Sequence, residues 1–329
     1  MRASPATRAI AGALIAVAIQ LVMVTAYAWP AARLAPRHLP VVIAGPARPA
    51  AAVAAQITRQ HPAAFDVIRA PTEAAARRVI TGRRAYGAIV VGGKAPQVLT
   101  ASAASPVVAQ LLTQIAGEMS GVASPARDVV PADTNDPHGA AFAALLLPLV
   151  ITSIIAGVAL TLLVGSAPWR LAGLGVFAVG GGAVTAAIAQ SWLLVLPGAY
   201  DAVAAVIGLI ALAVAAAVAG LGSLTRRAGR APAGLALGAA IMMVLGNPFS
   251  GAASAPEMLP RPWGQLGQWL PPGAGATLLR SAGYFGGARS AGLWATLAIW
   301  AAAGLALVAL SAPRTGGRAR RALDRKSVV

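Results

Sequence analysis

The residues of this sequence that could perform chemistry are few and scattered. Cysteine is absent, which excludes disulfides, cysteine-ligated zinc and thiol nucleophiles. The three histidines, His38, His61 and His138, lack the spacing of metal ligands. The nine acidic residues form no serine–histidine–aspartate or paired-carboxylate pattern. We therefore expect no enzymatic activity, no metal and no cofactor.

Two glycine-rich segments imitate nucleotide-binding motifs. Residues 87–95 approach a P-loop, but the spacing is off by one and no Ser or Thr follows Lys94. Residues 173–178 imitate a dinucleotide fingerprint, yet they lie inside an apolar run, where glycine favours close helix packing. The Gly234-x-x-x-Gly238 motif has the same interpretation. We predict that the chain does not hydrolyse ATP through a P-loop.

The composition indicates a membrane protein. Hydrophobic residues make up 58% of the chain, charged residues only 11%, and the mean hydropathy is +0.73. Soluble domains carry about 25% charged residues. The net charge of +17 would suggest nucleic acid in a soluble protein, but the basic residues sit mostly at the ends of apolar runs. We expect no nucleic-acid partner.

The sequence predicts an α-helical polytopic membrane protein with six transmembrane helices. The predicted spans are 9–29, 141–165, 171–193, 202–224, 232–245 and 291–312. A cleaved signal peptide is the alternative for the first, since residues 26–28 resemble a cleavage site, but its apolar core exceeds a signal's usual length. As delimited, the spans contain no charged residue, which argues against an ion-driven carrier.

Residues 31–138 differ from the rest of the chain. They hold 11 of the 26 basic residues and six of the nine acidic ones. Strands are predicted at 39–45, 65–68, 85–91 and 97–101, and helices at 49–60, 72–83 and 106–119. Thr72 is expected to cap its helix. This order predicts a small α/β domain between the first and second spans.

Charge fixes the predicted orientation. If the N-terminus lies in the cytoplasm, the cytoplasmic pieces 1–8, 166–170, 225–231 and 313–329 hold 12 basic residues. The short external loops hold three, so the arrangement follows the positive-inside rule. We expect a multi-pass protein of the cell membrane with both termini cytoplasmic, a basic tail at 313–329 and an extracytoplasmic α/β domain.

Residues 246–289 are apolar but too rich in proline and glycine to span a membrane. A re-entrant or interfacial hairpin on the outer face is predicted, either as a lid over the bundle or with a role in substrate exit. Ser254 and Glu257 form a capping-box pattern at a predicted helix start. The candidate functional residues of the hairpin are Asn247, Pro248, Phe249, Glu257 and Arg280.

The layout resembles the permease subunits of ABC-2-type exporters, in the branch related to phage infection protein. The resemblance rests on residues 39–45, 83–91 and, above all, 246–260 and 270–280. It implies a permease that forms a homodimer or heterodimer and works with a separate cytoplasmic P-loop ATPase. That ATPase would press on the short loops 166–170 and 225–231. The corresponding contact residues are Trp169, Arg170, Arg226, Arg227 and Arg230.

Two functions are carried forward from the sequence. The first is an ABC-type exporter permease that moves a hydrophobic or amphipathic substrate. Membrane lipids are expected to surround this permease. The second is a non-transporting scaffold or receptor that binds an envelope partner through the domain at 31–138. A neighbouring ATPase gene would favour the exporter.

Overall fold

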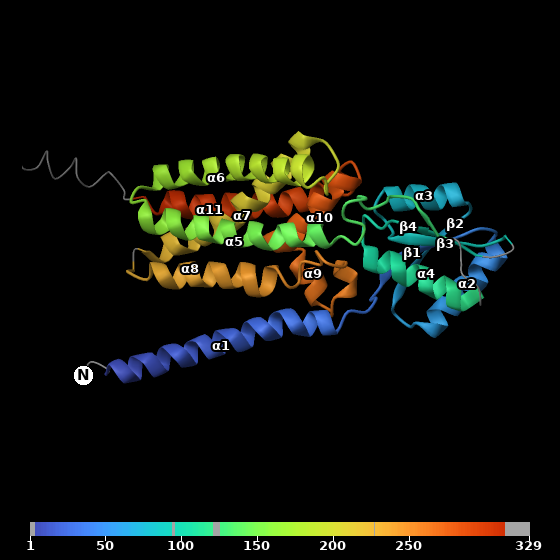
Figure 1. Cartoon of the computed structure of the whole chain (residues 1–329), viewed down its shortest axis with the longest axis horizontal. Coiled ribbons are helices and arrows are strands. Elements are labelled where there is room, and N and C mark those ends of the chain that lie inside the picture. The colour runs from blue at the N-terminus through green and yellow to red at the C-terminus, as the bar shows by residue number, and fades with distance from the viewer. Residues whose placement is uncertain (1–3, 94–95, 121–125, 227, 313–329) are drawn as a thin grey trace, which may run out of the picture.

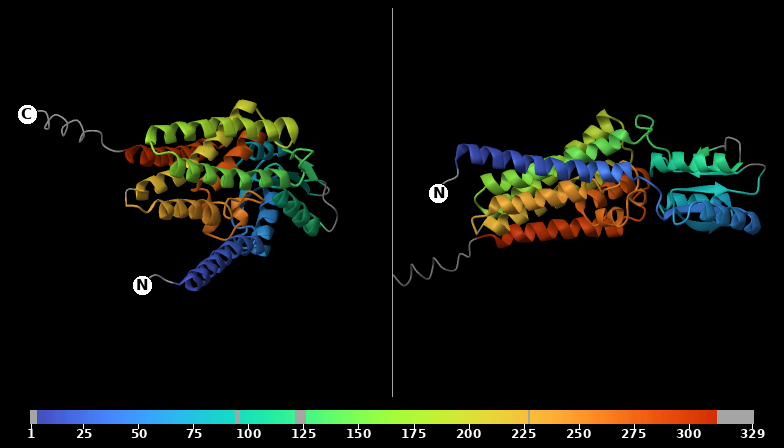
Figure 2. Two further views of the ribbon diagram at one scale, coloured as in Figure 1. Left: turned by 60° about the vertical axis from the view of Figure 1, so that its left-hand side comes forward. Right: turned by 90° about the horizontal axis from the view of Figure 1, so that it is seen from below.

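The structure is a computed structural model that describes residues 4–93, 96–120, 126–226 and 228–312. An elongated bundle of helices carries an α/β domain at one end (Figure 1; Figure 2). Among the described residues, five helices are long and apolar enough to cross a membrane. They are α1 (Pro5–Ala32), α5 (Ala140–Leu163), α6 (Ala167–Ala187) with the π-helical η1 (Ile188–Trp192), α7 (Tyr200–Arg226) and α11 (Ala291–Leu310). The architecture is that of a helical membrane protein.

The sixth predicted span forms a shorter helix. α8 (Ala231–Ala240) has 10 residues and continues into the π-helical η2 (Ile241–Gly246), which has 6. At ~1.5 Å per residue they reach about 24 Å, against a hydrocarbon core of roughly 30 Å. The described helices therefore include five full-length candidate spans, and the sixth stays a prediction.

α7 is the centre of the bundle and packs against α5, α6, α8 and α11. In its most apolar 18-residue window, 72% is buried. Small residues make these close crossings possible. A Cβ added to Gly304 of α11 would lie 2.3 Å from the carbonyl carbon of Ala216 in α7. A Cβ on Gly238 would lie 2.9 Å from the Cα of Val218, which confirms the predicted close packing at this glycine motif.

α1 stands apart from the other helices. None of its most apolar window is buried, and toward the N-terminus it leans away from the bundle (Figure 1). Its side chains form polar and aromatic contacts with the bundle near its C-terminal end. The Tyr27 hydroxyl donates to the carbonyl of Met243 over 3.2 Å, and the Trp29 and Phe249 rings meet edge to face at 6.5 Å. The apolar flank from Ile10 to Val24 is exposed.

The strands and helices predicted for residues 31–138 are present, and β5 is an additional strand. The elements are β1 (Leu39–Ala44), α2 (Ala47–Gln60), β2 (Phe65–Ala70), α3 (Glu73–Thr81), β3 (Gly87–Val90), β4 (Gln97–Thr100), α4 (Pro106–Ser120) and β5 (Ala126–Asp128). The strand order is β2-β1-β3-β4-β5; among the described strands the β3–β4 pair is antiparallel and the other pairs are parallel. Thr72 caps α3 as predicted, because its Oγ1 accepts from the Ala75 amide.

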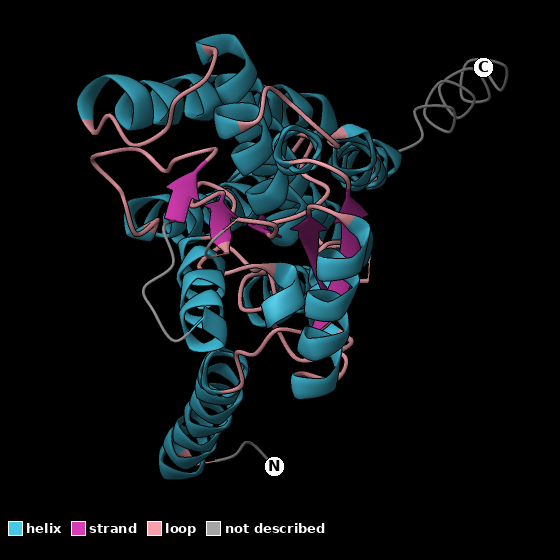
Figure 3. Cartoon of the chain, turned by 90° about the vertical axis from the view of Figure 1, so that its right-hand side faces the viewer, coloured by secondary structure: helices cyan, strands magenta, loops and turns pink. Residues whose placement is uncertain are grey.

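The sheet is covered on both faces (Figure 3). Because side chains alternate along a strand, Val42 and Ala44 of β1 pack toward α3, while Ile43 packs toward α2. The segment that imitates a P-loop is a strand and turn at residues 87–93, as predicted; Lys94 and Ala95 lie outside the described residues.

The hairpin at 246–289 contains η3 (Pro256–Met258), α9 (Trp263–Gly267) and α10 (Pro271–Tyr284). It lies at the end of the bundle that faces the α/β domain (Figure 1). α10 is largely buried and packs against α7 and α11. Ala255 and Met258 join a hydrophobic cluster with Leu39 and Val41 of β1. The α/β domain is therefore fixed to the bundle through the hairpin.

Candidate functional site

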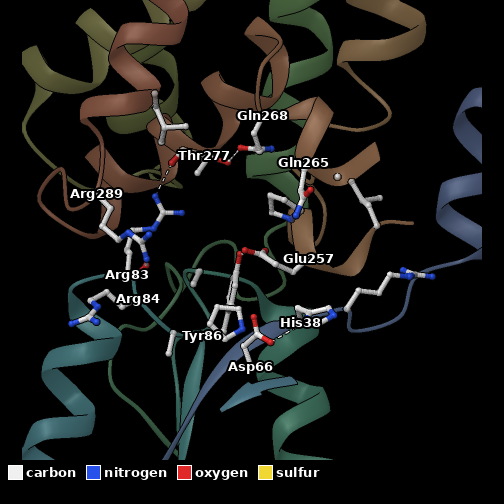
Figure 4. Close-up of a pocket in the computed structure, with 18 of the residues that line it drawn as sticks. His38, Asp66, Arg83, Arg84, Tyr86, Glu257, Gln265, Gln268, Thr277 and Arg289 are labelled. Atoms are coloured by element: carbon white, nitrogen blue, oxygen red, sulfur yellow. Dashed lines mark hydrogen bonds and ion pairs between the residues drawn. The ribbon is translucent and has the colours of Figure 1, made fainter. Parts of the chain in front are cut away.

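A cavity of about 750 Å³ lies between the α/β domain and the hairpin (Figure 4). Its volume falls within the roughly 300–1,000 Å³ typical of small-molecule sites. The charged residues that line it are five arginines and two carboxylates. They are Arg37, Arg83, Arg84, Arg261 and Arg289, with Asp66 and Glu257. The cavity therefore has an excess of positive charge.

Tyr86 and Glu257 point toward one another inside this cavity (Figure 4). The Tyr86 hydroxyl donates to Oε2 of Glu257 over 2.7 Å. Burial raises the pKa of Tyr86 well above its ordinary value, and the charge of Glu257 raises it further. The tyrosine therefore remains a hydrogen-bond donor at neutral pH, and this bond ties the domain to the hairpin.

The predicted capping box at Ser254 and Glu257 is wrong. The backbone is extended at Ala255, η3 comprises three residues, and the chain is extended again at Leu259. A helix of three residues has no complete first turn, so the Glu257 side chain makes no capping hydrogen bond there. Its carboxylate instead bonds Tyr86, a residue 171 positions away in sequence.

Arg83 reaches from the α/β domain to the hairpin. Its Nη1 donates to the carbonyl of Thr277 over 2.8 Å, and its guanidinium lies 5.2 Å from the centre of the Phe285 ring. Burial lowers the pKa of Arg83, while Tyr86 and Glu257 act in the opposite direction. An arginine keeps its charge under such conditions, so Arg83 places a partly buried cation in the cavity.

The linker after α1 closes another side of the cavity. Nη1 of Arg37 donates to the carbonyls of Ala35 and Met258, at 3.0 and 2.8 Å. Beside it, Nδ1 of His38 lies 2.8 Å from Oδ1 of Asp66. Within the described ranges, no group of three or more histidine or acidic residues gathers that could hold a metal ion.

The rim of the cavity includes large apolar side chains. Trp269 is 75% exposed and Leu266 is 46% exposed, and both belong to the lining. Nε1 of Trp300 in α11 donates to the backbone carbonyl of Trp269 over 2.8 Å, which fixes this part of the rim to the bundle. Tryptophan is enriched where a membrane meets water, so the rim is suited to the headgroup level of a bilayer.

Of the five candidate residues predicted in the hairpin, Glu257 lines the cavity and the other four do not. Nδ2 of Asn247 donates to the Tyr27 hydroxyl over 3.1 Å. The next residue, Pro248, is half-buried. Phe249 stacks on Trp263 with ring centres 4.9 Å apart. These residues connect α1 to the hairpin.

Arg280 lies deeper, inside the bundle. Its Nη2 donates to the carbonyl of Ala252 over 2.8 Å, and its guanidinium lies 4.4 Å from the centre of the Phe142 ring. The side chain is buried, so its contacts hold α10 against α5 and the hairpin turn.

Four of the five predicted ATPase-contact residues, Trp169, Arg170, Arg226 and Arg230, are described by the structure, and they lie at the opposite end of the bundle. The N-terminus of α1, the α5–α6 and α7–α8 connections and the end of α11 share this end (Figure 1). Trp169 is 73% exposed, and Arg226 and Arg230 are exposed. Nη1 of Arg226 also donates to the carbonyl of Thr161 over 3.0 Å. Arg227 and the tail 313–329 lie outside the described residues.

Arg170 differs from its predicted setting. α6 begins at Ala167, so Arg170 belongs to the helix rather than to a loop at 166–170. The side chain is 3% exposed, and its Nη1 and Nη2 donate to the hydroxyls of Ser223 and Ser311, at 2.5 and 3.2 Å. The prediction that the spans lack charge is therefore wrong for α6. Pro168, in the first helical turn, is the signal that marked the earlier helix start.

Sequence reasoning did not connect Arg83, Arg84, Tyr86 and Arg289 to one site. The first three belong to a segment that stood out through its resemblance to exporter permeases, and the last was counted in an external loop. Their meeting depends on how the domain rests on the hairpin, and hydropathy carries no signal for that contact. A comparison with protein-family models, curated proteins and solved structures finds no match to this chain.

Proposed function

We propose that this chain is the membrane-spanning permease subunit of an ABC-type exporter that moves a hydrophobic or amphipathic substrate. In this proposal both termini are cytoplasmic, the α/β domain is extracytoplasmic and the hairpin enters the outer side of the membrane. A separate cytoplasmic P-loop ATPase supplies the energy through the α5–α6 and α7–α8 connections. The resemblance, which rests above all on residues 246–260 and 270–280, and the basic character of the loop end support this assignment.

The observation that carries the proposal is the position of α7. At one end it packs against α10, directly beneath the α/β domain. At the other end its Arg226 bonds the end of α5, and its Ser223 accepts from Arg170 of α6. Conformational changes can shift whole helices by small sliding against their packed neighbours. A push on the loop end would therefore reach the hairpin through a single buried helix.

A second permease subunit, either identical or related, is part of the same proposal. The exposed flank of α1 from Ile10 to Val24 offers an apolar surface to lipid or to such a subunit. A scaffold that binds an envelope partner remains the alternative, and the experiment below separates the two.

The test is purification of the tagged protein from its native membrane in a mild detergent, followed by mass spectrometry of the proteins that accompany it. We expect a stoichiometric P-loop ATPase that is lost from a Trp169→Ala, Arg226→Gln, Arg230→Gln variant. Arg48→Gln with Arg59→Gln, two exposed arginines on α2, is the matched control and should retain the ATPase. Recovery of the protein alone, or with envelope proteins only, would contradict the exporter and favour the scaffold.

A further inference from the structure

The arginines of the cavity are not neutralised by the protein. Within the described residues, the ion pairs are His38–Asp66 and Arg77–Glu73, and none of the five lining guanidinium groups takes part in one. Arg37 and Arg83 donate to backbone carbonyls, which carry no net charge. The positive charge of the cavity therefore exceeds its negative charge, and in the described residues no lining guanidinium group is paired with a carboxylate.

The two lining carboxylates are already engaged. Asp66 pairs with His38, and Glu257 accepts the hydrogen bond of Tyr86. In the described part of the chain, the side chain of Arg84 shows no hydrogen bond or ion pair, and Arg289 has one long contact, 3.4 Å to the carbonyl of Arg83. An entering anion would therefore meet guanidinium groups with free donors.

Three of these arginines lie on one side of the cavity. Figure 4 shows Arg83 and Arg289 close together, below Thr277 and across from Glu257, with the neighbouring Arg84 side chain extending outward. Arg289 is close enough to Arg83 for its charge to lower the pKa of Arg83. Arginine forks match the oxygens of a phosphate, and charge-assisted hydrogen bonds of this kind are the strong ones.

The apolar rim of the cavity indicates that the ligand has an apolar part beside its anionic group. Trp269 and Leu266 expose large apolar surfaces next to the basic cavity, at the end of the bundle where the α/β domain begins. We propose that this cavity binds the phosphate headgroup of an anionic lipid, with the acyl chains lying outward along Trp269 and Leu266. This inference concerns binding alone and holds whether or not the chain is an exporter.

The test uses the full-length protein in nanodiscs of phosphatidylcholine that contain a minor fraction of phosphatidylglycerol with brominated acyl chains. Bromine quenches tryptophan fluorescence on contact, and the chain has 7 tryptophans. The difference between the wild type and Trp269→Phe isolates the quenching of Trp269. The reference is brominated phosphatidylcholine at the same mole fraction.

We expect brominated phosphatidylglycerol to be enriched about tenfold at Trp269 over brominated phosphatidylcholine. A few charge-assisted hydrogen bonds to the headgroup are enough for a difference of that size in affinity. Arg84→Gln with Arg289→Gln should remove the enrichment. Arg48→Gln with Arg59→Gln, which removes the same charge from the same domain away from the cavity, should preserve it. Arg84 and Arg289 are exposed, and unchanged melting and gel-filtration profiles will confirm that the variant is folded.

Three results would overturn the proposal. Equal quenching by the two brominated lipids would show no headgroup selectivity. Equal loss in the cavity variant and the control variant would show attraction to the overall charge of the domain. Displacement of the brominated lipid by micromolar glycerol 3-phosphate would show a site for soluble phosphates, and the lipid part of the proposal would fail.

Discussion

α1 and α7 are similar in length and in apolar character, with 28 and 27 residues, but they occupy opposite environments. α1 is exposed along its apolar core, whereas α7 is surrounded by other helices. A Cβ on Gly12 of α1 would meet nothing within 4 Å, while Gly208, Gly220 and Gly222 of α7 lie against neighbouring helices. Hydropathy therefore identifies a span, and small residues that fit a partner place it in the bundle.

The strongest test of this contrast adds a methyl group to each kind of helix. Gly304→Ala places a Cβ 2.3 Å from the backbone of α7, so the helices must separate. We expect a loss of about 2 kcal/mol in the free energy of unfolding, measured by thermal melting in detergent. Gly12→Ala is the matched control and should leave the free energy of unfolding unchanged or raise it by up to about 1 kcal/mol, because alanine favours a helix more than glycine does. Equal effects would mean that close packing does not distinguish the two helices.

A second test removes a polar contact of α7. Arg170→Ala deletes the bonds to Ser223 and Ser311, and we expect it to cost about 1.5 kcal/mol because hydrogen bonds from a charged group are lost. Trp169→Ala changes the adjacent residue, which faces outward. It should leave the melting temperature nearly unchanged. A larger loss of stability in Trp169→Ala than in Arg170→Ala would place Arg170, rather than Trp169, at the accessible surface.

The smallest effect is expected at the attachment of α1. Tyr27→Phe removes the hydroxyl that donates to Met243 and accepts from Asn247. The free energy of unfolding should fall by less than about 1 kcal/mol, since the bundle core is untouched. Hydrogen exchange at residues 241–247 should become faster, while exchange in α7 stays the same. Faster exchange in both would show that α1 stabilises the whole bundle.

The elements with strong local signals were predictable from the sequence. Thr72 caps α3, and the strand beginning at Leu39 is apolar and bounded by turns, so neighbouring residues suffice to define both. The helix start at Ala167 was also encoded locally, by Pro168, and was predicted four residues too late, at 171, because Arg170 was interpreted as a loop charge.

The candidate site was not predictable in the same way. Glu257 was interpreted through the residues beside it, yet its partner Tyr86 belongs to a different domain. Arg289 of the hairpin comes within 3.4 Å of the Arg83 carbonyl only because the α/β domain rests on the hairpin. Contacts between residues so far apart depend on tertiary packing, which hydrophobic periodicity does not describe.

The predicted sixth span, the short helix formed by α8 and η2, would have a consequence for the surrounding bilayer. Its apolar length is about 6 Å less than the usual hydrocarbon thickness, and such a mismatch is relieved by local thinning. Leu237 and Leu245 are exposed on this helix, and the bilayer would become thinner around them. The much longer α1, which lies alongside, can cross a bilayer of the usual thickness. The protein would therefore sit in an uneven membrane, and its conformational energy would depend on lipid chain length.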